Sequence, residues 1–364
     1  MNYLEKHRNE IFKKYTTEEL LKDIKSYQSG SGRLLKVLNH FFEECIFECS
    51  APRGQKSPME ALQNENDIEF ILKYVKNKPN FYTGNEVANI KTFFRNAGRL
   101  ARKVANFCPK NARNIYFRYH DINGDKINIL DTSMGFGSRM SAALLSGHNY
   151  VGFDPNQNLF KKLNEYKDFL IQNKICEGQT CGLICKGSEE FVPCLENKFD
   201  VSFTSPPYFN LEKYSDDGSL STKNYDNYTN WIEYFVKPTI ENTYKYLKIG
   251  GYAMINIKNL TRGKKEPLFD DWFEIFKNHS GFEFVEVFEI EHQSKKNYTM
   301  NCNYDKEDYK GFKEPVMVFK KIKLKVMLFI ATHHIEELQN IKQKSFHTMN
   351  FMIGVENYPK TILF

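Results

Sequence analysis

Four consecutive residues, Ser205, Pro206, Pro207 and Tyr208, could together present a ligand-binding surface. They directly follow Asp200–Phe203, a run that predicts a buried strand. Two prolines supply no backbone N–H groups and fix φ, so the strand cannot continue past them with normal pairing. We therefore predict a rigid turn with a hydroxyl on one side and an aromatic ring on the other. The simpler alternative is a loop that only ends the strand.

A second candidate site lies upstream, where "ILDTSMGFGSRMSAALL" predicts a strand, a glycine turn and a helix. Gly135 and Gly137 would let the backbone approach a ligand closely, and the helix N-terminus would attract negative charge. The third glycine of the dinucleotide fingerprint is missing, which disfavours NAD. Taken alone, the motif is equally explained by a tight strand–helix turn without a ligand.

The next predicted strand, "YVGFDP", ends at Asp154. A carboxylate at this position can accept hydrogen bonds from both hydroxyls of a ribose. Its structural alternative is to cap the helix that starts near Asn156, and the two roles are compatible. Because the glycine turn lies just upstream, we predict that Asp154 binds a ribose.

Taken in order, D-x-x-x-G-F-G, F-D-P and T-S-P-P-Y resemble the motifs of S-adenosylmethionine-dependent amino-methyltransferases of DNA. The resemblance covers roughly residues 116–321. Enzymes of this family methylate an exocyclic nitrogen of cytosine or adenine. The SPPY motif after an apolar strand is the specific part, because the other two motifs occur in many methyltransferases. The resemblance implies S-adenosylmethionine as the cofactor and Ser205 to Tyr208 as the catalytic turn.

The resemblance also assigns residues to the three parts of the cofactor. They are Asp131, Gly135, Phe136 and Gly137 around the methionine, Asp154 at the ribose, and Gly187 and Ser188 near the adenine.

The chemistry of amine methylation accounts for the types of residue in the SPPY motif. An exocyclic amine is a poor nucleophile because its lone pair is delocalised into the ring. Hydrogen bonds from its two N–H groups to the Ser205 hydroxyl and the Pro206 carbonyl would free that pair for attack on the sulfonium methyl. The base must leave the duplex to reach the turn, and Tyr208 offers a ring on which it can stack. Such stacking contributes about 1–3 kcal/mol per base. No metal is required.

The target base is predicted less directly than the reaction. Serine at the first motif position is commoner among cytosine-N4 enzymes of the family than among adenine-N6 enzymes, so cytosine N4 is favoured. An adenine-N6 enzyme acting on DNA or RNA is the alternative within the same chemistry. A non-catalytic nucleic-acid-binding subunit that kept the fold is the alternative from another class. The resemblance implies double-stranded DNA with a flipped base as the partner, and it leaves open a cognate restriction enzyme.

The elements that would position these residues change in character near residue 115. Residues 1–115 have helical periodicity, with a Thr cap before "TEELLKDIKSY" and apolar residues three and four apart in "RLLKVLNHFFEECIF". Beyond them, short apolar runs alternate with helical stretches. The predicted strands are 126–133, 150–155, 182–187, 200–205, 251–259, 281–290 and 314–321.

This pattern predicts an α/β fold: a Rossmann-like methyltransferase domain over 116–321, preceded by a helical region over 1–115. The domain would contain a mostly parallel seven-stranded sheet with helices on both faces. Its motif order leaves no room for a recognition domain between the two sites, so we predict target recognition by residues 1–115, helped by the polar loop 291–311. Residues 322–364 form a C-terminal extension without an assigned role.

Basic residues are concentrated in the N-terminal region. Residues 1–115 hold 20 Lys and Arg against 13 Asp and Glu, whereas the whole chain has a net charge of +6. A segment without acidic residues suits a phosphate backbone, although a solvated helix face is the usual explanation of such a pattern. The residues predicted to bind DNA are Lys91, Arg95, Arg99, Arg102, Lys103, Lys110, Arg113 and Arg118.

Composition limits the other classes of function. Eight cysteines without a C-x-x-C pair in 364 residues indicate neither a disulfide framework nor a zinc module. No signal-like leader opens the chain, and no apolar run approaches the roughly 20 residues of a membrane span. We therefore expect a soluble protein of a reducing compartment, the cytoplasm of a bacterial cell, encoded by the cell or by a phage.

Overall fold

The computed structural model describes residues 2–50, 55–78, 82–96, 100–119, 126–209, 225, 227–260, 266–290, 302–303 and 314–323. These residues belong to one compact unit that ends at Lys323. Most of the predicted C-terminal extension and of the polar loop 291–311 lies outside the described residues. No helix in the described part of the chain is long and apolar enough to cross a membrane.

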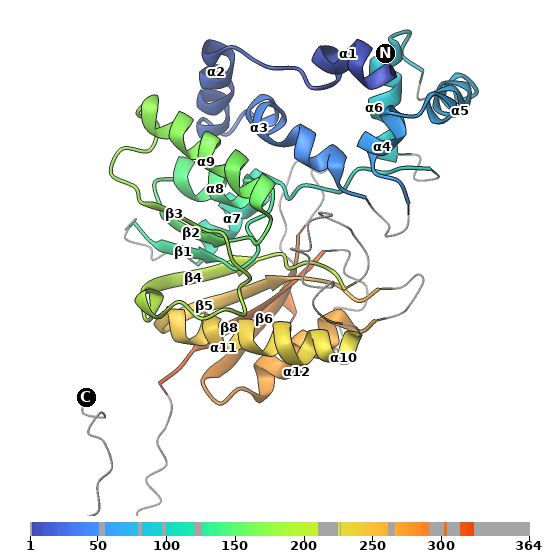
Figure 1. Cartoon of the computed structure of the whole chain (residues 1–364). Coiled ribbons are helices and arrows are strands. Elements are labelled where there is room, and N and C mark those ends of the chain that lie inside the picture. Colours follow the sequence, from blue (N-terminus) through green and yellow to red (C-terminus); the bar gives the residue numbers. More distant parts are fainter. Residues whose placement is uncertain are drawn as a thin grey trace, which may run out of the picture. The chain divides into compact units, whose positions relative to one another are not determined.

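One sheet forms the centre of this unit (Figure 1). Its strands are β1 (Asn128–Asp131), β2 (Asn149–Phe153), β3 (Cys181–Ile184), β4 (Phe199–Thr204), β5 (Leu247–Asn256), β6 (Phe282–Glu289), β7 (Cys302–Asn303) and β8 (Pro315–Lys321). Their order is β3-β2-β1-β4-β5-β8-β6-β7. The strands from β3 to β5 in this order pair in parallel, and β8 is antiparallel to both β5 and β6.

The strand order confirms the predicted fold class. All seven predicted strands are present, and among the described residues only the two-residue β7 was not predicted. With β8 inserted between β5 and β6, the seven longer strands have the order typical of the Rossmann-like methyltransferase fold. The order reverses at β1, which lies between β2 and β4. In open α/β sheets, ligands bind beyond the carboxyl ends of the strands at such a reversal.

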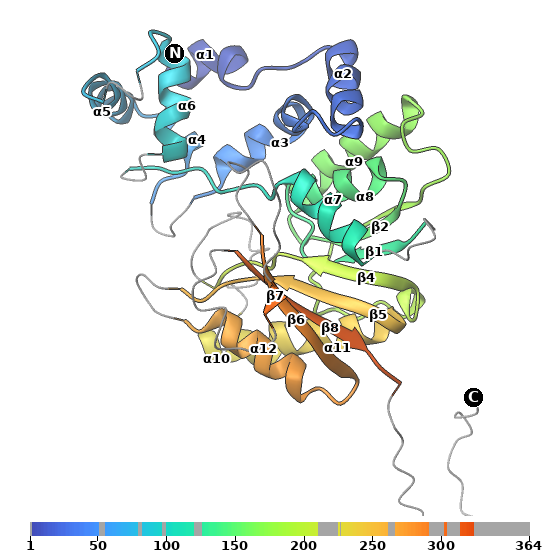
Figure 2. The ribbon, with the colours of Figure 1, turned by 180° about the vertical axis from the view of Figure 1, so that it is seen from behind.

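Helices cover both faces of the sheet (Figures 1 and 2). One face carries α7 (Pro109–Arg118), α8 (Ser138–Leu145) and α9 (Gln157–Gln172), and the other carries α10 (Tyr228–Trp231), α11 (Lys237–Tyr246) and α12 (Leu268–Asn278). A π-helical turn, Ile232–Val236, joins α10 to α11. The alternating pattern predicts a helical stretch between β3 and β4 as well, but this prediction is wrong, because only a 3₁₀ turn forms there, at Pro193–Leu195. The proline begins that turn, and no residue of it is buried.

The remaining helices precede α7 in the chain. They are α1 (Tyr3–Ile11), α2 (Thr17–Gln28), α3 (Leu35–Glu48), α4 (Pro58–Leu62), α5 (Glu65–Lys76) and α6 (Glu86–Asn96). The predicted cap of α2 is present: the Thr16 hydroxyl accepts from the Glu19 backbone N–H, and the Glu19 carboxylate accepts from the Thr16 N–H. Such reciprocal capping satisfies backbone donors that a helix start leaves unpaired.

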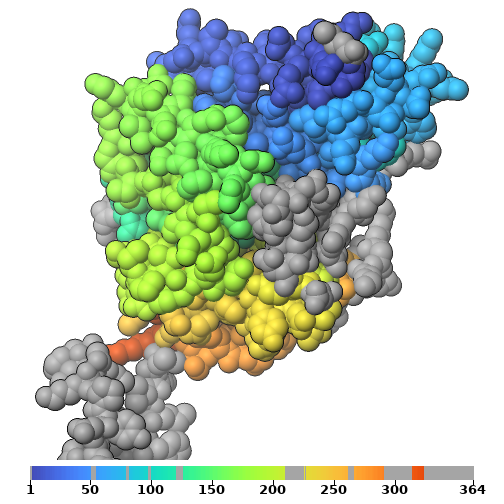
Figure 3. Space-filling model, viewed as in Figure 1, coloured from blue at the N-terminus to red at the C-terminus, as the bar shows by residue number. Residues whose placement is uncertain are grey.

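These helices divide between two hydrophobic cores. Side chains of α2, α3 and α7 join the core under α8 and α9, and this core extends to the sheet. Side chains of α1, α4, α5 and α6 form a separate core. Helix α3 belongs to both, with Phe42 in the first core and Phe47 in the second. In Figure 3 the surface of α9 is continuous with that of the N-terminal helices, and α3 and α9 are in contact.

Candidate active site

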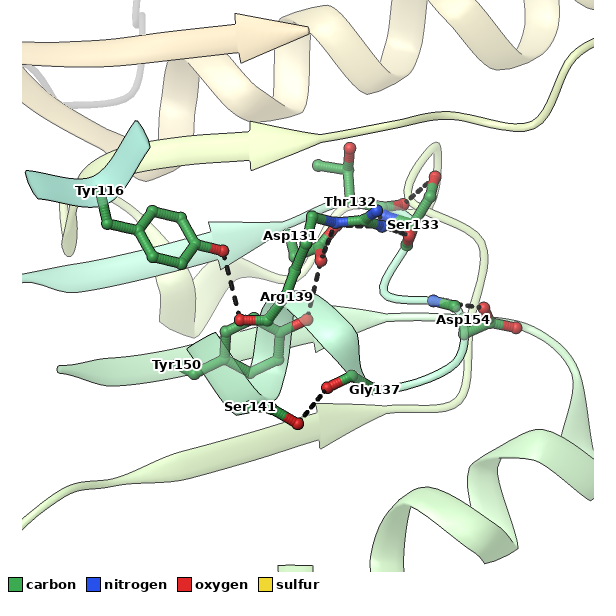
Figure 4. Close-up of polar contacts among 10 residues, drawn as sticks. Tyr116, Asp131, Thr132, Ser133, Gly137, Arg139, Ser141, Tyr150 and Asp154 are labelled. Carbon is green, nitrogen blue, oxygen red and sulfur yellow. Dashed lines mark hydrogen bonds and ion pairs between the residues drawn. The ribbon is translucent and has the colours of Figure 1, made fainter. Parts of the chain in front are cut away.

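The carboxylate that ends β1, Asp131, is fully buried and fully hydrogen-bonded (Figure 4). Its Oδ2 accepts from Arg139 Nε at 2.7 Å and from the Tyr150 hydroxyl at 2.8 Å. Its Oδ1 accepts from Arg139 Nη2 and from the Ser133 N–H, both at 3.2 Å. A carboxylate has about four acceptor positions, and these contacts occupy all of them. Asp131 therefore shapes the turn after β1 through protein contacts, and it offers no acceptor to a ligand.

Arg139, on α8, supplies the cation of this buried pair. Burial alone would lower the pKa of Arg139, but the Asp131 charge outweighs it and raises that pKa. Its guanidinium also donates to the Ser133 carbonyl, and its own carbonyl accepts from the Tyr116 hydroxyl. Arg139 was not among the predicted site residues. The available signal was one arginine in the otherwise uncharged helix "SRMSAALL".

The two glycines of the turn have left-handed φ values, 54° at Gly135 and 72° at Gly137. These values explain the glycines, because side chains other than hydrogen are strained there. Among the described residues, the atom nearest to a Cβ on Gly135 would be the Ser133 carbonyl oxygen, 3.9 Å away, so these residues leave the space beside Gly135 open to a ligand. A Cβ on Gly137 would lie 2.6 Å from the ring of Phe42. The two glycines therefore serve different needs, open space at the first and close packing at the second.

Phe136, between the glycines, was predicted to line the methionine pocket. Its side chain is 6% exposed and belongs to the core shared with α8 and α9. Its carbonyl accepts from Asn106 Nδ2 at 3.3 Å. In the structure, then, Phe136 anchors the turn to the core.

Asp154 follows β2 and faces the glycine turn. Its Oδ2 accepts from the Gly135 N–H at 3.2 Å, and its Oδ1 accepts from the Asn156 N–H at 3.0 Å. Burial raises the pKa of Asp154 to about 6, although both N–H groups favour the charged form. The N-cap residue of α9 is Asn156, whose side chain accepts from the Leu159 N–H, while Asp154 accepts from the N–H of Asn156 itself, so the capping role considered for Asp154 is present in part. Each oxygen of Asp154 retains acceptor capacity for a ligand hydroxyl.

The carboxylate of Glu189, after β3, was not among the predicted site residues. The hydroxyl of Ser188 is 2.9 Å from that of Thr239, and both side chains are buried. The next residue, Glu189, has a carboxylate that occupies the space a Cβ on Gly187 would need. Burial raises the pKa of Glu189. Its Oε1 accepts from the Tyr225 hydroxyl at 3.4 Å, and its Oε2 has no hydrogen-bond partner among the described residues.

The SPPY turn begins directly after the end of β4 at Thr204, as predicted. Pro206 is buried, whereas Ser205 and Tyr208 are partly exposed. The Tyr208 hydroxyl accepts from the backbone N–H of Lys258, just beyond β5, at 3.1 Å. This bond was not expected, because the predicted stacking role needs only the ring.

Sheet pairing brings the two turns to neighbouring positions. β1 and β4 are adjacent and parallel, with Leu130 opposite Ser202. The glycine turn and the SPPY turn therefore leave the sheet at the same edge, on either side of the point where the strand order reverses.

The structure gives most of the eight basic residues a role inside the protein. Two of them pair with carboxylates that are themselves buried. Lys91 lies 2.9 Å from Glu43 Oε1, and Arg118 lies 2.7 Å from Glu286 Oε2. These partners already neutralise the two cations, so the structure argues against Lys91 and Arg118 as phosphate ligands.

Three more of the basic residues pack against neighbouring helices. Lys110 donates to the Gly30 carbonyl at 2.7 Å, and Arg113 donates to the Tyr27 carbonyl at 3.1 Å. Lys103 is partly buried 5.8 Å from the centre of the Phe47 ring, and burial lowers its pKa. These contacts within the protein thus account for the three basic residues without any contact to DNA.

The remaining three basic residues are Arg95, Arg99 and Arg102. Arg95 and Arg102 are exposed, and Arg99 lies outside the described residues. The described part of the chain contains no group of three or more His, Cys, Asp or Glu placed to hold a metal ion.

Comparison with known proteins gives similarity in structure only. No protein-family profile matches the sequence, and no curated protein matches it. A tRNA (m1A58) methyltransferase from Aquifex aeolicus superposes with a TM-score of 0.37 and 13% identity, over 61% of this chain and 72% of that chain. An rRNA methylase from Streptococcus thermophilus gives 0.35 and 14%, over 60% and 100%. An S-adenosylmethionine-dependent O-methyltransferase from Thermotoga maritima gives 0.35 and 12%, over 61% and 68%.

Proposed function

We propose that this chain is an S-adenosylmethionine-dependent methyltransferase acting on an exocyclic amine of a base in DNA, with cytosine N4 as the favoured target. One observation carries the proposal. The glycine turn and the SPPY turn follow adjacent parallel strands, at the reversal of strand order where this type of sheet binds ligands. A cofactor held at the first turn and a base held at the second would meet at that edge of the sheet.

The acceptors on the cofactor side fit the charge of S-adenosylmethionine. The Asp131 carboxylate is neutralised by Arg139, whereas no ion pair of Asp154 or Glu189 is seen among the described residues. Asp154 can accept hydrogen bonds from the ribose hydroxyls beside the open space at Gly135. Glu189 Oε2 can accept from the adenine amine, which would satisfy an oxygen that has no hydrogen-bond partner among the described residues. The cofactor supplies a methyl group already activated by the sulfonium.

The SPPY turn would supply the acceptors for the target amine. The Ser205 hydroxyl and the Pro206 carbonyl would each accept one of its N–H groups, making the nitrogen more tetrahedral and freeing its lone pair. Held by Asp154 and Glu189, S-adenosylmethionine would supply its methyl group to this nitrogen with cleavage of the carbon–sulfur bond, and the extra proton of the amine would leave to solvent afterwards. The Tyr208 ring, fixed through its hydroxyl to Lys258, would stack on the flipped base.

We propose fewer residues for contact with the DNA backbone than the sequence predicted. Arg95 and Arg102 are exposed, and Arg99 remains a sequence-based candidate. Replacing an arginine that binds a phosphate should weaken binding of all DNA sequences and reduce its salt dependence. A cognate restriction enzyme remains a proposed partner.

Single-turnover methyl transfer from labelled S-adenosylmethionine to DNA tests the function, with the product digested to nucleosides. Ser205→Ala should slow transfer on the order of 100-fold, with cofactor affinity within about twofold of wild type, because the lost bond strengthens in the transition state. Ser202→Ala is the matched control. It removes a buried hydroxyl of β4, the strand before the turn, and this hydroxyl has no hydrogen-bond partner among the described residues, so the variant should transfer at the wild-type rate.

Each outcome of this experiment has one meaning. N4-methylcytosine supports the favoured target, and N6-methyladenine replaces it with the alternative. Cofactor binding without transfer to DNA or RNA would support the non-catalytic subunit. Transfer by Ser205→Ala at the wild-type rate would make the turn structural and refute its proposed chemistry.

A further inference from the structure

Helix α3 connects the glycine turn to a separate group of helices. We call α1, α4, α5 and α6, which share their own hydrophobic core, the outer helical module. Phe42, in the middle of α3, lies in the core that reaches the sheet. The next residue, Glu43, pairs with Lys91 of α6, and Phe47, one turn later, packs edge-on against Phe94. Helix α3 therefore contacts both the core that reaches the sheet and the outer helical module.

The contact at the turn end is between Phe42 and Gly137. Phe42 is fully buried, and two atoms of its ring lie 2.6 Å from where a Cβ on Gly137 would be. The ring also packs edge-on against Tyr166, with 5.7 Å between centroids. The Ser141 hydroxyl donates to the Gly137 carbonyl at 2.7 Å. The left-handed conformation of Gly137, the N-cap residue of α8, is thus held both by the Phe42 ring and by the Ser141 hydroxyl.

A second contact from the N-terminal region reaches the same turn. Asn106, in the segment between α6 and α7, donates to the Phe136 carbonyl at 3.3 Å. Two consecutive residues of the turn are therefore supported by side chains from residues 1–115, the region that sequence patterns set apart as a recognition region.

We propose that Phe42 is a positioning residue for the cofactor turn, and that α3 couples occupancy of the cofactor site to the outer helical module. The inference rests on the proposed function. A ligand beside Gly135 favours one conformation of the turn, and the ring of Phe42 fits against that conformation. Binding free energies are reciprocal, so a ligand that orders the turn also stabilises whatever packs against it.

Replacing Phe42 tests the positioning role. In the full-length protein, Phe42→Ala should weaken binding of S-adenosylmethionine about fivefold or more, measured by calorimetry where the variant is folded. Phe42→Leu should restore most of the affinity by refilling the space. Phe41→Ala is the matched control, since the adjacent Phe41 packs on Tyr166 and Phe169. It should lower the melting temperature with affinity within about twofold of wild type.

A double-mutant cycle separates failure of this inference from failure of the proposed function, because it needs no cofactor. Gly137→Ala should lower the melting temperature more in wild type than in Phe42→Ala, since the added methyl competes with the ring for space. Equal losses in both backgrounds would refute the contact. If wild type binds no S-adenosylmethionine, the proposed function and the coupling fall together, while the cycle still decides whether Phe42 positions the turn.

Hydrogen exchange tests the coupling itself. Saturating S-adenosylhomocysteine should slow amide exchange in α3 and α6 of wild type, and this protection of α6 should be lost in Phe42→Ala at equal saturation. Protection of α6 that persists in Phe42→Ala, or unchanged affinity in both Phe42 variants, would overturn the proposal.

Discussion

The two turns of the proposed active site are held in place by different means. The glycine turn rests on a buried ion pair, since Arg139 binds both the Asp131 carboxylate and the Ser133 carbonyl. The SPPY turn has two prolines that limit its backbone, and the Tyr208 hydroxyl ties it to Lys258 beyond the neighbouring strand. The first turn depends on two buried charges that must remain paired with each other. The second turn depends on the stiffness of its backbone. Variants of the first should therefore lose stability, whereas variants of the second should mainly lose rate.

The largest effect is expected from removing the cation of the buried pair. Arg139→Met leaves the Asp131 carboxylate buried without its ion-pair partner. Breaking such a pair costs about 3–5 kcal/mol in the free energy of unfolding. Urea denaturation at neutral pH measures this loss.

Two further variants make the Arg139 result specific. Arg113→Met, which removes an arginine bonded to neutral carbonyls, should cost about 1 kcal/mol. Asp131→Leu combined with Arg139→Met should recover much of the stability, because no unpaired charge remains. A stable single variant Arg139→Met would show that the glycine turn does not depend on this pair.

The next effect concerns Asp154, whose pKa burial raises to about 6. As the pH falls through 6 the carboxylate becomes protonated, so affinity for S-adenosylmethionine should decrease. Asp154→Asn should weaken binding about tenfold at pH 8, as expected for lost charge-assisted bonds, and should remove this pH dependence. Calorimetric titrations between pH 5 and pH 8 provide the measurement, and unchanged affinity in Asp154→Asn would exclude Asp154 as the ribose ligand.

The same raised pKa makes a prediction about stability with the opposite direction in pH. A carboxyl whose pKa is higher in the folded state stabilises the fold below its unfolded pKa, near 3.9, and that contribution disappears as the pH rises through about 6. Ionised Asp154 thus reduces stability at neutral pH, and Asp154→Asn should be at least as stable as wild type at pH 8. Lost affinity together with retained stability distinguishes a ligand-binding residue from a structural one.

The smallest effect is expected from removing the Tyr208 hydroxyl. Tyr208→Phe removes the acceptor for the Lys258 N–H while keeping the ring. We expect a loss of about 1 kcal/mol in unfolding free energy, together with a reduced single-turnover rate because the ring is less well fixed. Tyr208→Ala should weaken binding of the flipped base by a further 1–3 kcal/mol, roughly, through lost stacking. Identical rates for wild type and both variants would exclude Tyr208 from base capture.

The sequence predicted what depends on local pattern. The alternation of apolar runs and helical stretches located all seven longer strands, and the motifs located both turns at strand ends. These features have short periods, so neighbouring residues reveal them. Asp154 was predicted to bind a ribose because it follows a strand close to a glycine turn, and that role stays a prediction.

Features that depend on distant partners were not predictable in this way. Arg118 was interpreted as a DNA ligand because its partner, Glu286, lies 168 positions away and is joined to it only by the fold. The sequence likewise could not show that Arg139 turns back onto Asp131, or that Glu189 fills the space beside Gly187. Charge is visible in a sequence, but its neutralisation is a property of the tertiary structure.

The position of α3 in two cores limits how this protein can be recombined with a related one. Phe42 belongs to the core of the sheet and Phe47 to that of the outer helical module, while α1 of that module precedes α2 and α3 in the chain. Exchanging residues 1–115 as one block between related proteins would therefore remove helices that pack in the core of the sheet. A chimera that retains α2, α3 and α7 would keep these helices. Its exchange points would lie between α1 and α2, between α3 and α4, and between α6 and α7. The outer helical module thus has a hydrophobic core of its own, but its helices are not consecutive in the sequence.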